Sequence, residues 1–336
     1  MPSERIRAVG LLSGGLDSTL ATRLMLDLGA EVHPVNFSTV FCQCNRTTGG
    51  CRHTAAGVAR ELGLRLTSLN VTEEYLEIAR HPRYGRGSSF NPCVDCRIFM
   101  LSKARRFMEQ ISAEVVFTGE VIGQRPMSQT RKVMAIIEQE SGLKGRLLRP
   151  LCARLFPPTI PEREGHIDRR RLLGLSGRSR KPQIELARGF GMEEIPCSGG
   201  GCLLTDRRFG ARMFDLLAHN QLDIPNVLLA KVGRHFRLSE VAKAVVGRNK
   251  AENQKIVTLA RPGDRLLELA DFSGPTTLLR GQTDHPHLLQ AAALTRRYGD
   301  AEDGQPVTVT VTEPEGETTL LSLDGLSAAE ILSTRI

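Results

Sequence analysis

The chain has 336 residues, of which 40% are hydrophobic, and its formal net charge is +8. This length allows one large or two moderate domains, and no stretch approaches the roughly 20 apolar residues that cross a bilayer. The start of the chain lacks the hydrophobic run and cleavage site of a signal peptide, so we expect a soluble, cytoplasmic protein with no membrane partner.

The first half of the chain alternates predicted strands and helices. Residues 6–12 read as a buried strand, and leucines then recur every four residues from Leu16 until Gly29, where a helix C-cap belongs. Pro34 weakens the next predicted strand. The alternation predicts an α/β fold with a doubly wound, mostly parallel sheet, whose ligands bind at the carboxyl ends of strands. The further predicted strands are 31–37, 64–71 and 114–119, and the further predicted helices are 54–62 and 95–111.

The composition and periodicity of the sequence change toward the C-terminus. Residues 146–202 are rich in Pro, Gly and Arg and show little periodicity. Beyond about residue 225, "NVLLAKVG", "KAVVG" and "TTLLRG" predict strands of a smaller α+β domain, and "PVTVTVT" followed by "TTLLSL" predicts a hairpin. We divide the chain into a nucleotide domain (1–190), a cysteine-containing linker packed on it (191–225) and a C-terminal domain (226–336).

The distribution of charge and the number of cysteines further restrict the candidate functions. Residues 146–188 carry eleven Lys or Arg and four Asp or Glu, so one short region holds almost the whole positive excess. A concentrated positive field attracts polyanions, and we interpret the region as facing nucleic acid or nucleotide phosphate, with a solvated surface as the alternative. Eight cysteines in a cytosolic chain of this size favour metal or thiol chemistry over a disulfide framework.

The segment "LLSGGLDSTL" forms a glycine loop between the first strand and the first helix. Gly14 and Gly15 can adopt positive φ and let an anion approach the backbone, and the helix that follows adds its positive end. A Walker loop would place a lysine next, whereas this loop has Asp17. An aspartate beside phosphates is consistent with bound Mg²⁺, and a simple capped turn is the alternative.

This loop resembles that of the PP-loop ATP pyrophosphatases, because its residues match their SGGxDS signature. Members of that superfamily cleave ATP between the α and β phosphates, attach AMP to a substrate oxygen and release pyrophosphate. The resemblance therefore implies ATP and Mg²⁺ as cofactors, with Asp17 in a catalytic role. The predicted ATP-binding residues are Ser13, Gly14, Gly15, Asp17, Ser18, Phe37, Gly119 and Glu120.

Two further segments are predicted to contact substrate. "TGEVIGQRPMSQ" follows a strand, and its carboxyl end is the ligand edge of a parallel sheet, so we favour substrate contact by Gln124, Arg125 and Gln129 over a purely structural loop. "SGRSRK" places Arg178, Arg180 and Lys181 on a flexible Ser/Gly loop that can fold over phosphates, with an exposed linker as the alternative.

The cysteines offer a second centre. Cys93 and Cys96 have CxxC spacing before a helix, and Cys197 and Cys202 flank a run of glycines whose N–H groups can bond cluster sulfurs. We favour an iron–sulfur centre, with structural zinc and a thioredoxin-like pair as alternatives. Cys152, between apolar residues, is predicted to be a buried small hydrophobe. A group with poor zinc spacing is either without a role or part of a loop that handles sulfur or metal: Cys42, Cys44, Cys51 and His53.

Longer stretches resemble thiouridylase-like PP-loop proteins, relatives of tRNA 2-thiouridylase and tRNA 4-thiouridine synthase. "NPCVDCRIFML", "FTGEVIGQRPMSQ", "SGRSRKPQ" and "GGGCLLTD" carry this resemblance over roughly residues 5–215. It implies a [4Fe-4S] cluster on the catalytic residues Cys93, Cys96 and Cys202, with Cys197 as the alternate ligand and zinc as the alternative metal. The tail, about 226–285, resembles the NFACT-type RNA-binding domain. Residues there that could meet phosphates, unless they are solvated strand-edge charges, are Arg234, His235, Arg237, Lys243 and Arg248.

The predicted function is ATP-dependent thiolation of tRNA. A uridine carbonyl oxygen would be adenylated and replaced by sulfur from an iron–sulfur cluster or a persulfide. The predicted partners are tRNA and an external sulfur donor, namely a cysteine desulfurase, a persulfide carrier or sulfide; a homodimer stays open. The alternatives are a PP-loop enzyme that transfers nitrogen, with zinc at the cysteines, and a non-catalytic RNA- or ribosome-associated factor.

Overall fold

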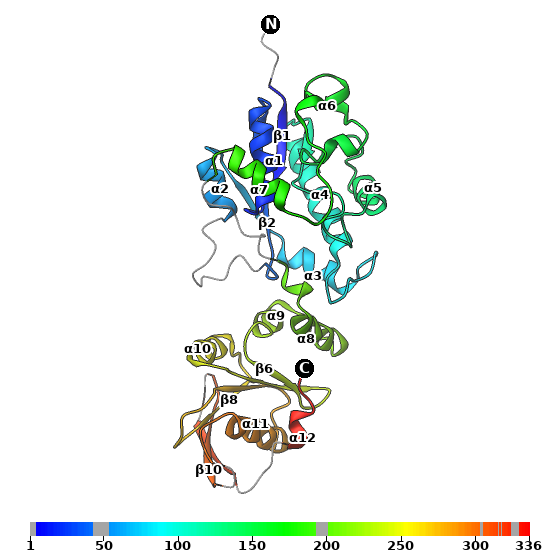
Figure 1. Cartoon of the computed structure of the whole chain (residues 1–336). Coiled ribbons are helices and arrows are strands. Elements are labelled where there is room, and N and C mark those ends of the chain that lie inside the picture. The colour runs from blue at the N-terminus through cyan, green and yellow to red at the C-terminus, as the bar shows by residue number, and fades with distance from the viewer. Residues whose placement is uncertain are drawn as a thin grey trace. The chain divides into compact units, whose positions relative to one another are not determined.

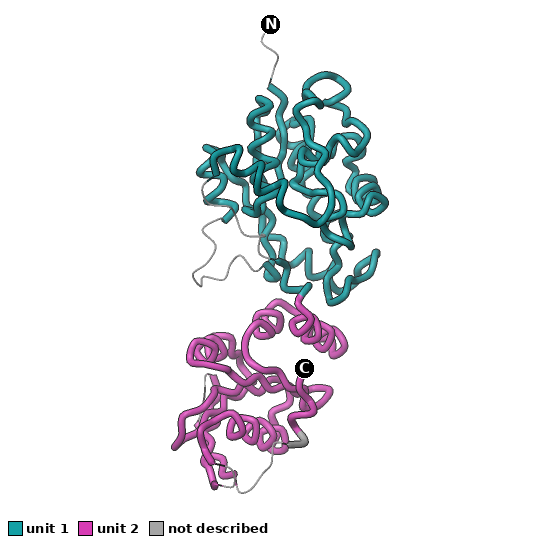
Figure 2. The backbone as a smooth tube through the Cα atoms, in the orientation of Figure 1, with its two compact units in different colours: residues 1–205 teal, residues 206–336 magenta. Residues whose placement is uncertain are grey.

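The computed structural model describes residues 5–42, 54–192, 201–302, 305–314, 316, 318–323 and 329–336. The chain divides into two compact units, Met1–Thr205 and Asp206–Ile336 (Figure 2). The boundary falls within residues 191–225, where the side chain of Asp206 accepts a hydrogen bond from the Phe209 N–H and caps a helix. Across the described ranges, no helix is long and apolar enough to cross a membrane.

Unit 1 contains the predicted doubly wound sheet (Figure 1). Five parallel strands run in the order β3-β2-β1-β4-β5. The strands are β1 (Arg7–Leu11), β2 (Glu31–Ser38), β3 (Thr67–Asn70), β4 (Val115–Phe117) and β5 (Leu147–Leu148). The helices are α1 (Leu16–Asp27), α2 (Ala55–Glu61), α3 (Thr72–Arg80), α4 (Cys93–Gln110), α5 (Arg131–Glu140), α6 (Ile160–Arg163) and α7 (Lys181–Gly189), with 3-10 turns at Ala153–Leu155, Arg169–Arg171 and Leu203–Thr205.

Alternation along the strands explains why helices cover both faces of this sheet. In β1, Ala8 packs into the core under α1 and α7, whereas its neighbour Val9 packs into the core under α4 and α5. Pro34 does not prevent β2 from forming. It pairs with Gly10 of β1, and the pairing with β3 begins only at Val35, so Pro34 has a strand neighbour on one side only.

Unit 2 is built on an antiparallel sheet of six strands in the order β11-β10-β8-β9-β7-β6. The strands are β6 (Arg234–Arg237), β7 (Ala242–Val246), β8 (Arg265–Leu269), β9 (Thr277–Gly281), β10 (Val307–Thr312) and β11 (Thr318–Leu323). The helices are α8 (Arg207–Ala218), α9 (Ile224–Leu229), α10 (Lys250–Leu259), α11 (His285–Arg297) and α12 (Ala329–Leu332). Leu279 packs toward α11 and Leu278 toward α9 and α10, so helices cover both faces here as well.

Sequence prediction in this unit succeeded for the hairpin and failed for one segment. The β10–β11 hairpin is confirmed, with Val307 opposite Leu323. The run "NVLLAKVG", predicted as a strand, is mostly α9 and the turn after it. The side chain of Asp223 caps this helix by accepting a hydrogen bond from the Asn226 N–H, and Pro225 lies in the first turn, where proline favours a helix start.

Candidate nucleotide and thiol sites

The glycine loop, residues 13–18, connects the carboxyl end of β1 to α1. Gly14 has φ +80°, a backbone conformation that residues with a Cβ atom rarely adopt. The Ser18 Oγ donates to the Gly15 carbonyl oxygen at 2.9 Å and lies 3.1 Å from the Ser13 Oγ. Three of the predicted ATP-binding side chains and glycines are thus tied into one rigid turn at a helix N-terminus, a position that favours anions.

Asp17 lies in the first turn of α1 and has one oxygen available for a ligand. Its Oδ2 accepts a hydrogen bond from the Gln124 Nε2 at 3.0 Å. Its Oδ1 is buried and has no hydrogen-bond partner among the residues that the structure describes. A buried carboxylate oxygen without a partner is costly unless something else satisfies it, and carboxylate oxygens are the ligands that Mg²⁺ prefers. The local structure therefore fits the predicted Mg²⁺ beside the phosphates.

Gly119 brings the end of β4 against the glycine loop. A Cβ at this position would lie 2.4 Å from the carbonyl carbon of Asp17 and 2.5 Å from the Ser18 nitrogen. Only glycine therefore allows this approach. Phe37, at the end of β2, is half-buried and packs against the core beneath α4.

Glu120 follows Gly119 and is 3% exposed. Its carboxylate lies between two arginines, with the Arg97 Nε 3.2 Å from Oε1 and the Arg149 Nε 3.5 Å from Oε2. Arg97 belongs to the first turns of α4, directly after Cys96. This ion pair therefore links the end of β4, next to the glycine loop, to the helix that carries the CxxC pair.

The predicted substrate residues divide by environment. Gln124 positions Asp17, as described above. Gln129 is 2% exposed, and its Oε1 accepts from the Arg125 N–H at 2.9 Å, so it closes the loop on itself. Arg125 is exposed and remains available to a ligand. Arg178 is exposed too.

The prediction that "SGRSRK" is loop throughout is wrong at its end. Arg180 is the N-cap residue of α7, and Lys181 is the first residue of that helix, where its side chain is exposed. Pro182 in the first turn is the physical reason, because its fixed φ suits a helix start.

Part of the basic excess in residues 146–188 is structural. Arg149 is 3% exposed and donates to the Glu138 Oε2 at 2.9 Å. Arg169 donates to the Ala153 and Phe156 carbonyl oxygens at 3.1 and 2.7 Å. The remaining basic residues that are exposed are Arg146, Arg154, Arg163, Arg170, Arg171, Arg178, Lys181 and Arg188.

Four cysteines of unit 1 gather at the same edge of the sheet, and we call Cys42, Cys93, Cys96 and Cys202 the thiol cluster. Cys93 and Cys96 lie in the first turns of α4, and the Asn91 Nδ2 donates to the Cys93 sulfur at 3.1 Å. Cys42 follows β2 and pairs with Cys202 in an antiparallel bridge. Residues more than a hundred positions apart in sequence thus meet.

The pKa values of these thiols reflect electrostatic interactions among them. Burial raises the pKa of Cys202 to about 12, and the charges of Cys96, Cys42 and Cys93 raise it as well. Burial raises the pKa of Cys96 to about 11, partly offset by the Arg97 charge and by a hydrogen bond from Tyr75. Sequence reasoning missed Tyr75 and Arg97, because no motif marks either residue.

The donors of the thiol cluster suit the chemistry of an iron–sulfur cluster or of zinc, since both take cysteine thiolates. Within the ranges that the structure describes, no three His, Cys, Asp or Glu side chains are arranged as ligands of one ion. The cluster therefore stays a prediction. Cys44, Cys51, His53 and Cys197 lie outside the described residues.

Cys152 is fully buried, as predicted, and is not part of the thiol cluster. Its S–H donates to the Glu120 carbonyl oxygen at 3.2 Å, and burial raises its pKa to about 11.

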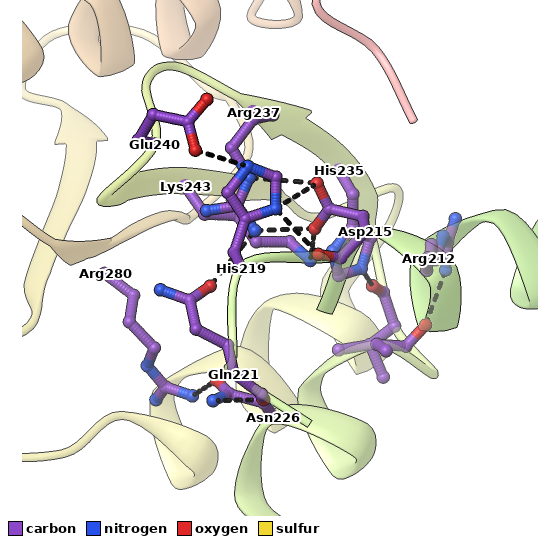
Figure 3. A network of polar contacts seen from close by, with 12 residues as sticks. Arg212, Asp215, His219, Gln221, Asn226, His235, Arg237, Glu240, Lys243 and Arg280 are labelled. Carbon is purple, nitrogen blue, oxygen red and sulfur yellow. Dashed lines mark hydrogen bonds and ion pairs between the residues drawn. The ribbon is translucent and has the colours of Figure 1, made fainter. Parts of the chain in front are cut away.

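Unit 2 contains a buried charge network around Asp215 of α8 (Figure 3). Arg237 donates to its two carboxylate oxygens at 2.9 and 2.6 Å, and the Lys243 Nζ donates at 3.2 Å. Burial opposes the charged form of Asp215, yet these two cations hold its pKa below the usual value. The network attaches α8 to the β6–β7 hairpin.

This arrangement corrects the expectation for the C-terminal basic residues. Arg237 and Lys243 are engaged by Asp215, and His235 is fully buried, with its Nε2 2.7 Å from the Val232 carbonyl oxygen. Arg248 donates to the Glu252 carboxylate at 2.8 Å, and the Arg234 guanidinium stacks 4.5 Å over the Tyr298 ring. Arg237, Lys243 and His235 therefore stabilise the fold and are not open phosphate contacts, whereas Arg248 is exposed and Arg234 is half-buried, so a phosphate contact by these two stays a prediction.

A glycine loop at the edge of a parallel α/β sheet, with thiols at the same edge, defines a nucleotide-binding α/β protein with a thiol site. Residues 4–154 match the family model described as Thiamine biosynthesis protein (ThiI), and residues 233–334 match that of the NFACT protein RNA binding domain. The first part of the chain is therefore similar to the ThiI-like PP-loop proteins, and the C-terminal part is similar to the NFACT RNA-binding domain.

Three curated relatives are similar to parts of the chain. The tRNA-specific 2-thiouridylase MnmA of Syntrophotalea carbinolica is 33% identical over 117 residues, which cover 32% of this chain and 32% of that protein. MnmA of Symbiobacterium thermophilum is 26% identical over 227 residues, covering 61% and 54%. The probable tRNA sulfurtransferase of Thermococcus kodakarensis is 30% identical over 148 residues, covering 43% and 36%. The chain thus spans between 32% and 54% of the length of these relatives.

Two solved structures show partial likeness. A 4-thiouridine synthetase in complex with RNA and ATP is 21% identical with a TM-score of 0.39, covering 67% of this chain and 52% of that chain. The C-terminal part of the fibronectin/fibrinogen-binding protein from Streptococcus suis is 14% identical with a TM-score of 0.28, covering 46% and 77%.

Proposed function

We propose that this protein is an ATP-dependent tRNA sulfurtransferase that adenylates a uridine carbonyl oxygen and replaces it with sulfur. One observation carries the proposal: the glycine loop with its unpartnered Asp17 oxygen and the thiol cluster lie at one sheet edge, joined through Glu120 and Arg97. Adenylation acts on the carbonyl oxygen and the sulfur nucleophile attacks the carbon of the same carbonyl group, so a shared sheet edge for the two sets of groups supports the proposal. The ThiI-like match supports the same reading.

In the activation step, the glycine loop would hold the phosphates that leave. The backbone N–H groups at the start of α1 and the helix dipole stabilise the charge of the departing pyrophosphate. Asp17 would hold Mg²⁺ through Oδ1, while Gln124 keeps the carboxylate oriented through Oδ2. The uridine oxygen attacks the α phosphate, pyrophosphate leaves, and AMP remains on the oxygen.

In the second step, a sulfur nucleophile attacks the carbon that carries the activated oxygen. The C–O bond breaks, AMP leaves with the bonding electrons, and a C=S bond remains. Cys93, Cys96 and Cys202 would hold the predicted [4Fe-4S] cluster, which supplies a site for exogenous sulfide when bound. The sulfur atom comes from an external sulfide donor, or from an external persulfide whose outer sulfur attacks the carbon; in the second case a thiol then cleaves the S–S bond, which leaves C=S on the uridine and a disulfide as the other product.

RNA recognition would use unit 2 together with the exposed cations of unit 1. The NFACT match covers residues 233–334. Arg125, Arg178 and Lys181 are exposed on unit 1 and are free to meet phosphates.

Pyrophosphate release tests the proposal with the full chain. Incubation with Mg²⁺-ATP, tRNA and sulfide should release pyrophosphate only with RNA present and should yield a thionucleoside, seen by mass spectrometry. Asp17→Asn should lower this rate by about a hundredfold or more, because an amide keeps the bond to Gln124 but loses the charge that holds the metal. Asp27→Asn, at the other end of α1, is the control. The proposal would be wrong if Asp17→Asn turned over at the wild-type rate. It would also be wrong if the protein bound RNA without releasing pyrophosphate.

The metal content tests the finer prediction separately. Protein purified without oxygen should contain iron and acid-labile sulfide, and alanine at Cys93, Cys96 or Cys202 should remove the visible absorbance. Cys152→Ala should leave the absorbance unchanged, because the Cys152 thiol donates a hydrogen bond to the Glu120 carbonyl oxygen and lies outside the thiol cluster. If the purified protein contains zinc and no iron, the iron–sulfur cluster is excluded, whereas the proposed ATP-dependent adenylation is unaffected.

A further inference from the structure

Cys42 and Cys202 lie directly opposite each other in an isolated antiparallel bridge. The Leu203 N–H donates to the Phe41 carbonyl oxygen at 2.9 Å, so the hydrogen bond flanks the two cysteines and does not join them. They therefore form a non-hydrogen-bonded pair. In such pairs the Cα atoms are about 4.5 Å apart, and both side chains point to the same face.

These dimensions match those of a disulfide. Bridged cysteines have Cα atoms roughly 4.4–6.8 Å apart, so the backbone already stands at a bonding distance. Both residues are free thiols in this structure, and both are partly exposed, which allows a small reagent to reach them.

We propose that Cys42 and Cys202 form a reversible disulfide by exchange with a low-molecular-weight disulfide. One thiolate attacks a sulfur of the reagent R–S–S–R, and RS⁻ leaves, which produces a mixed disulfide on the protein. The second thiolate then attacks the protein sulfur of that mixed disulfide, and a second RS⁻ leaves. The two cysteines lose two protons and two electrons, and the reagent is reduced to two thiols.

Closing this bond has a structural consequence for unit 1. It fixes the 3-10 turn at Leu203–Thr205 covalently to the chain that follows β2. It also removes Cys202 from the thiols able to bind metal or sulfur. That second consequence rests on the proposed function, whereas the disulfide itself does not.

Peptide mapping of the full-length protein tests the proposal without any activity assay. Metal-free reduced protein is equilibrated with oxidised glutathione, free thiols are blocked with iodoacetamide, and the protein is digested with trypsin without reduction. Cleavage after Lys and Arg places Cys42 in peptide 24–46 and Cys202 in peptide 189–207. We expect these two peptides to be linked and the link to disappear with dithiothreitol.

Variants identify the sulfurs, because each peptide contains a second cysteine. Cys44→Ser and Cys197→Ser should keep the linked peptide, whereas Cys42→Ser and Cys202→Ser should each lose it. The first two variants also show that a serine in either peptide does not by itself prevent linkage. Absence of the linked peptide in the wild type, its persistence in Cys42→Ser or Cys202→Ser, or its loss in Cys44→Ser or Cys197→Ser would overturn the proposal.

Discussion

Tyr75 of α3 brings a phenol into the thiol cluster and is 2% exposed. Its ring packs edge-on against Phe41, with centroids 5.7 Å apart. Burial and the charges of the neighbouring cysteines raise its pKa well above the usual value, so the phenol stays protonated and donates a hydrogen bond to the Cys96 sulfur. That bond lowers the pKa of Cys96 and opposes the effect of burial.

The first prediction follows from that hydrogen bond. Tyr75→Phe should shift the pH dependence of Cys96 alkylation to higher pH by about one unit. The physical reason is that the Cys96 thiolate loses a hydrogen-bond donor, whose effect on the pKa is roughly one to two units at most. The measurement is the rate of iodoacetamide labelling of metal-free protein between neutral and alkaline pH, read by mass spectrometry. Tyr298→Phe, in unit 2, is the matched control. An unchanged profile in Tyr75→Phe would show that the phenol does not bond Cys96.

Gly119 supports a second prediction at the same scale. Gly119→Ala places a Cβ 2.4 Å from the Asp17 backbone, and the glycine loop must shift to accommodate it. We expect ATP affinity, measured by calorimetry, to fall about tenfold or more, since one such factor corresponds to only about 1.4 kcal/mol of lost binding. Gly189→Ala, where the new Cβ meets nothing within 4 Å, should bind ATP like the wild type. Equal affinity in both variants would remove Gly119 from the nucleotide site.

Among the elements, α7 and the residues before it carry the third prediction. Arg178→Glu, Arg180→Glu and Lys181→Glu combined should weaken tRNA or ATP binding, and the salt slope for tRNA should decrease by about 1–3. Glutamate at the start of a helix is compatible with its dipole, so α7 should remain folded. Binding is measured over a salt series. The control reverses three exposed cations in other segments of unit 1, namely Arg65, Arg106 and Lys144. Unchanged affinity for both ligands would show that these three cations contact neither tRNA nor ATP.

The elements also show which parts of the fold the sequence could predict. β1, β2 and β4 were predictable because apolar residues fill short segments bounded by turns, and the glycine loop identified the first strand-to-helix junction. α7 and α9 were missed because both are short and their apolar residues show no clear period. Their start signals, Pro182 and Pro225 in the first turns, were the available evidence.

The candidate site was predictable only where local motifs mark it. The spacing of Cys93 and Cys96 and the glycine loop were visible in the sequence. The contact between Gln124 and Asp17 and the pairing of Cys42 with Cys202 depend on how distant segments meet, which no local pattern records. Buried charges such as Lys243 were misread as surface cations, because only tertiary structure reveals the carboxylate that pairs with them.

At the scale of the whole molecule, two units with separate cores should unfold in two transitions. Asp215→Ala leaves Arg237 and Lys243 buried without their partner, which typically costs about 3–5 kcal/mol. We expect only the transition of unit 2 to move to lower denaturant, monitored by circular dichroism, while ATP binding to unit 1 persists. Asp271→Ala, an exposed carboxylate on unit 2, should leave both transitions in place. A shift in both transitions, or in neither, would refute this account of the network.

The position of the boundary after Thr205 has an evolutionary consequence. Every described thiol of the cluster, Cys202 included, precedes that boundary, and α8 begins just beyond it under its own cap at Asp206. Recombination at this junction could replace unit 2 and leave all described thiols of the cluster together in unit 1. A cut a few residues earlier would separate Cys202 from its partners. Lineages in which unit 1 is joined to a different C-terminal domain should therefore tend to preserve this short stretch with unit 1.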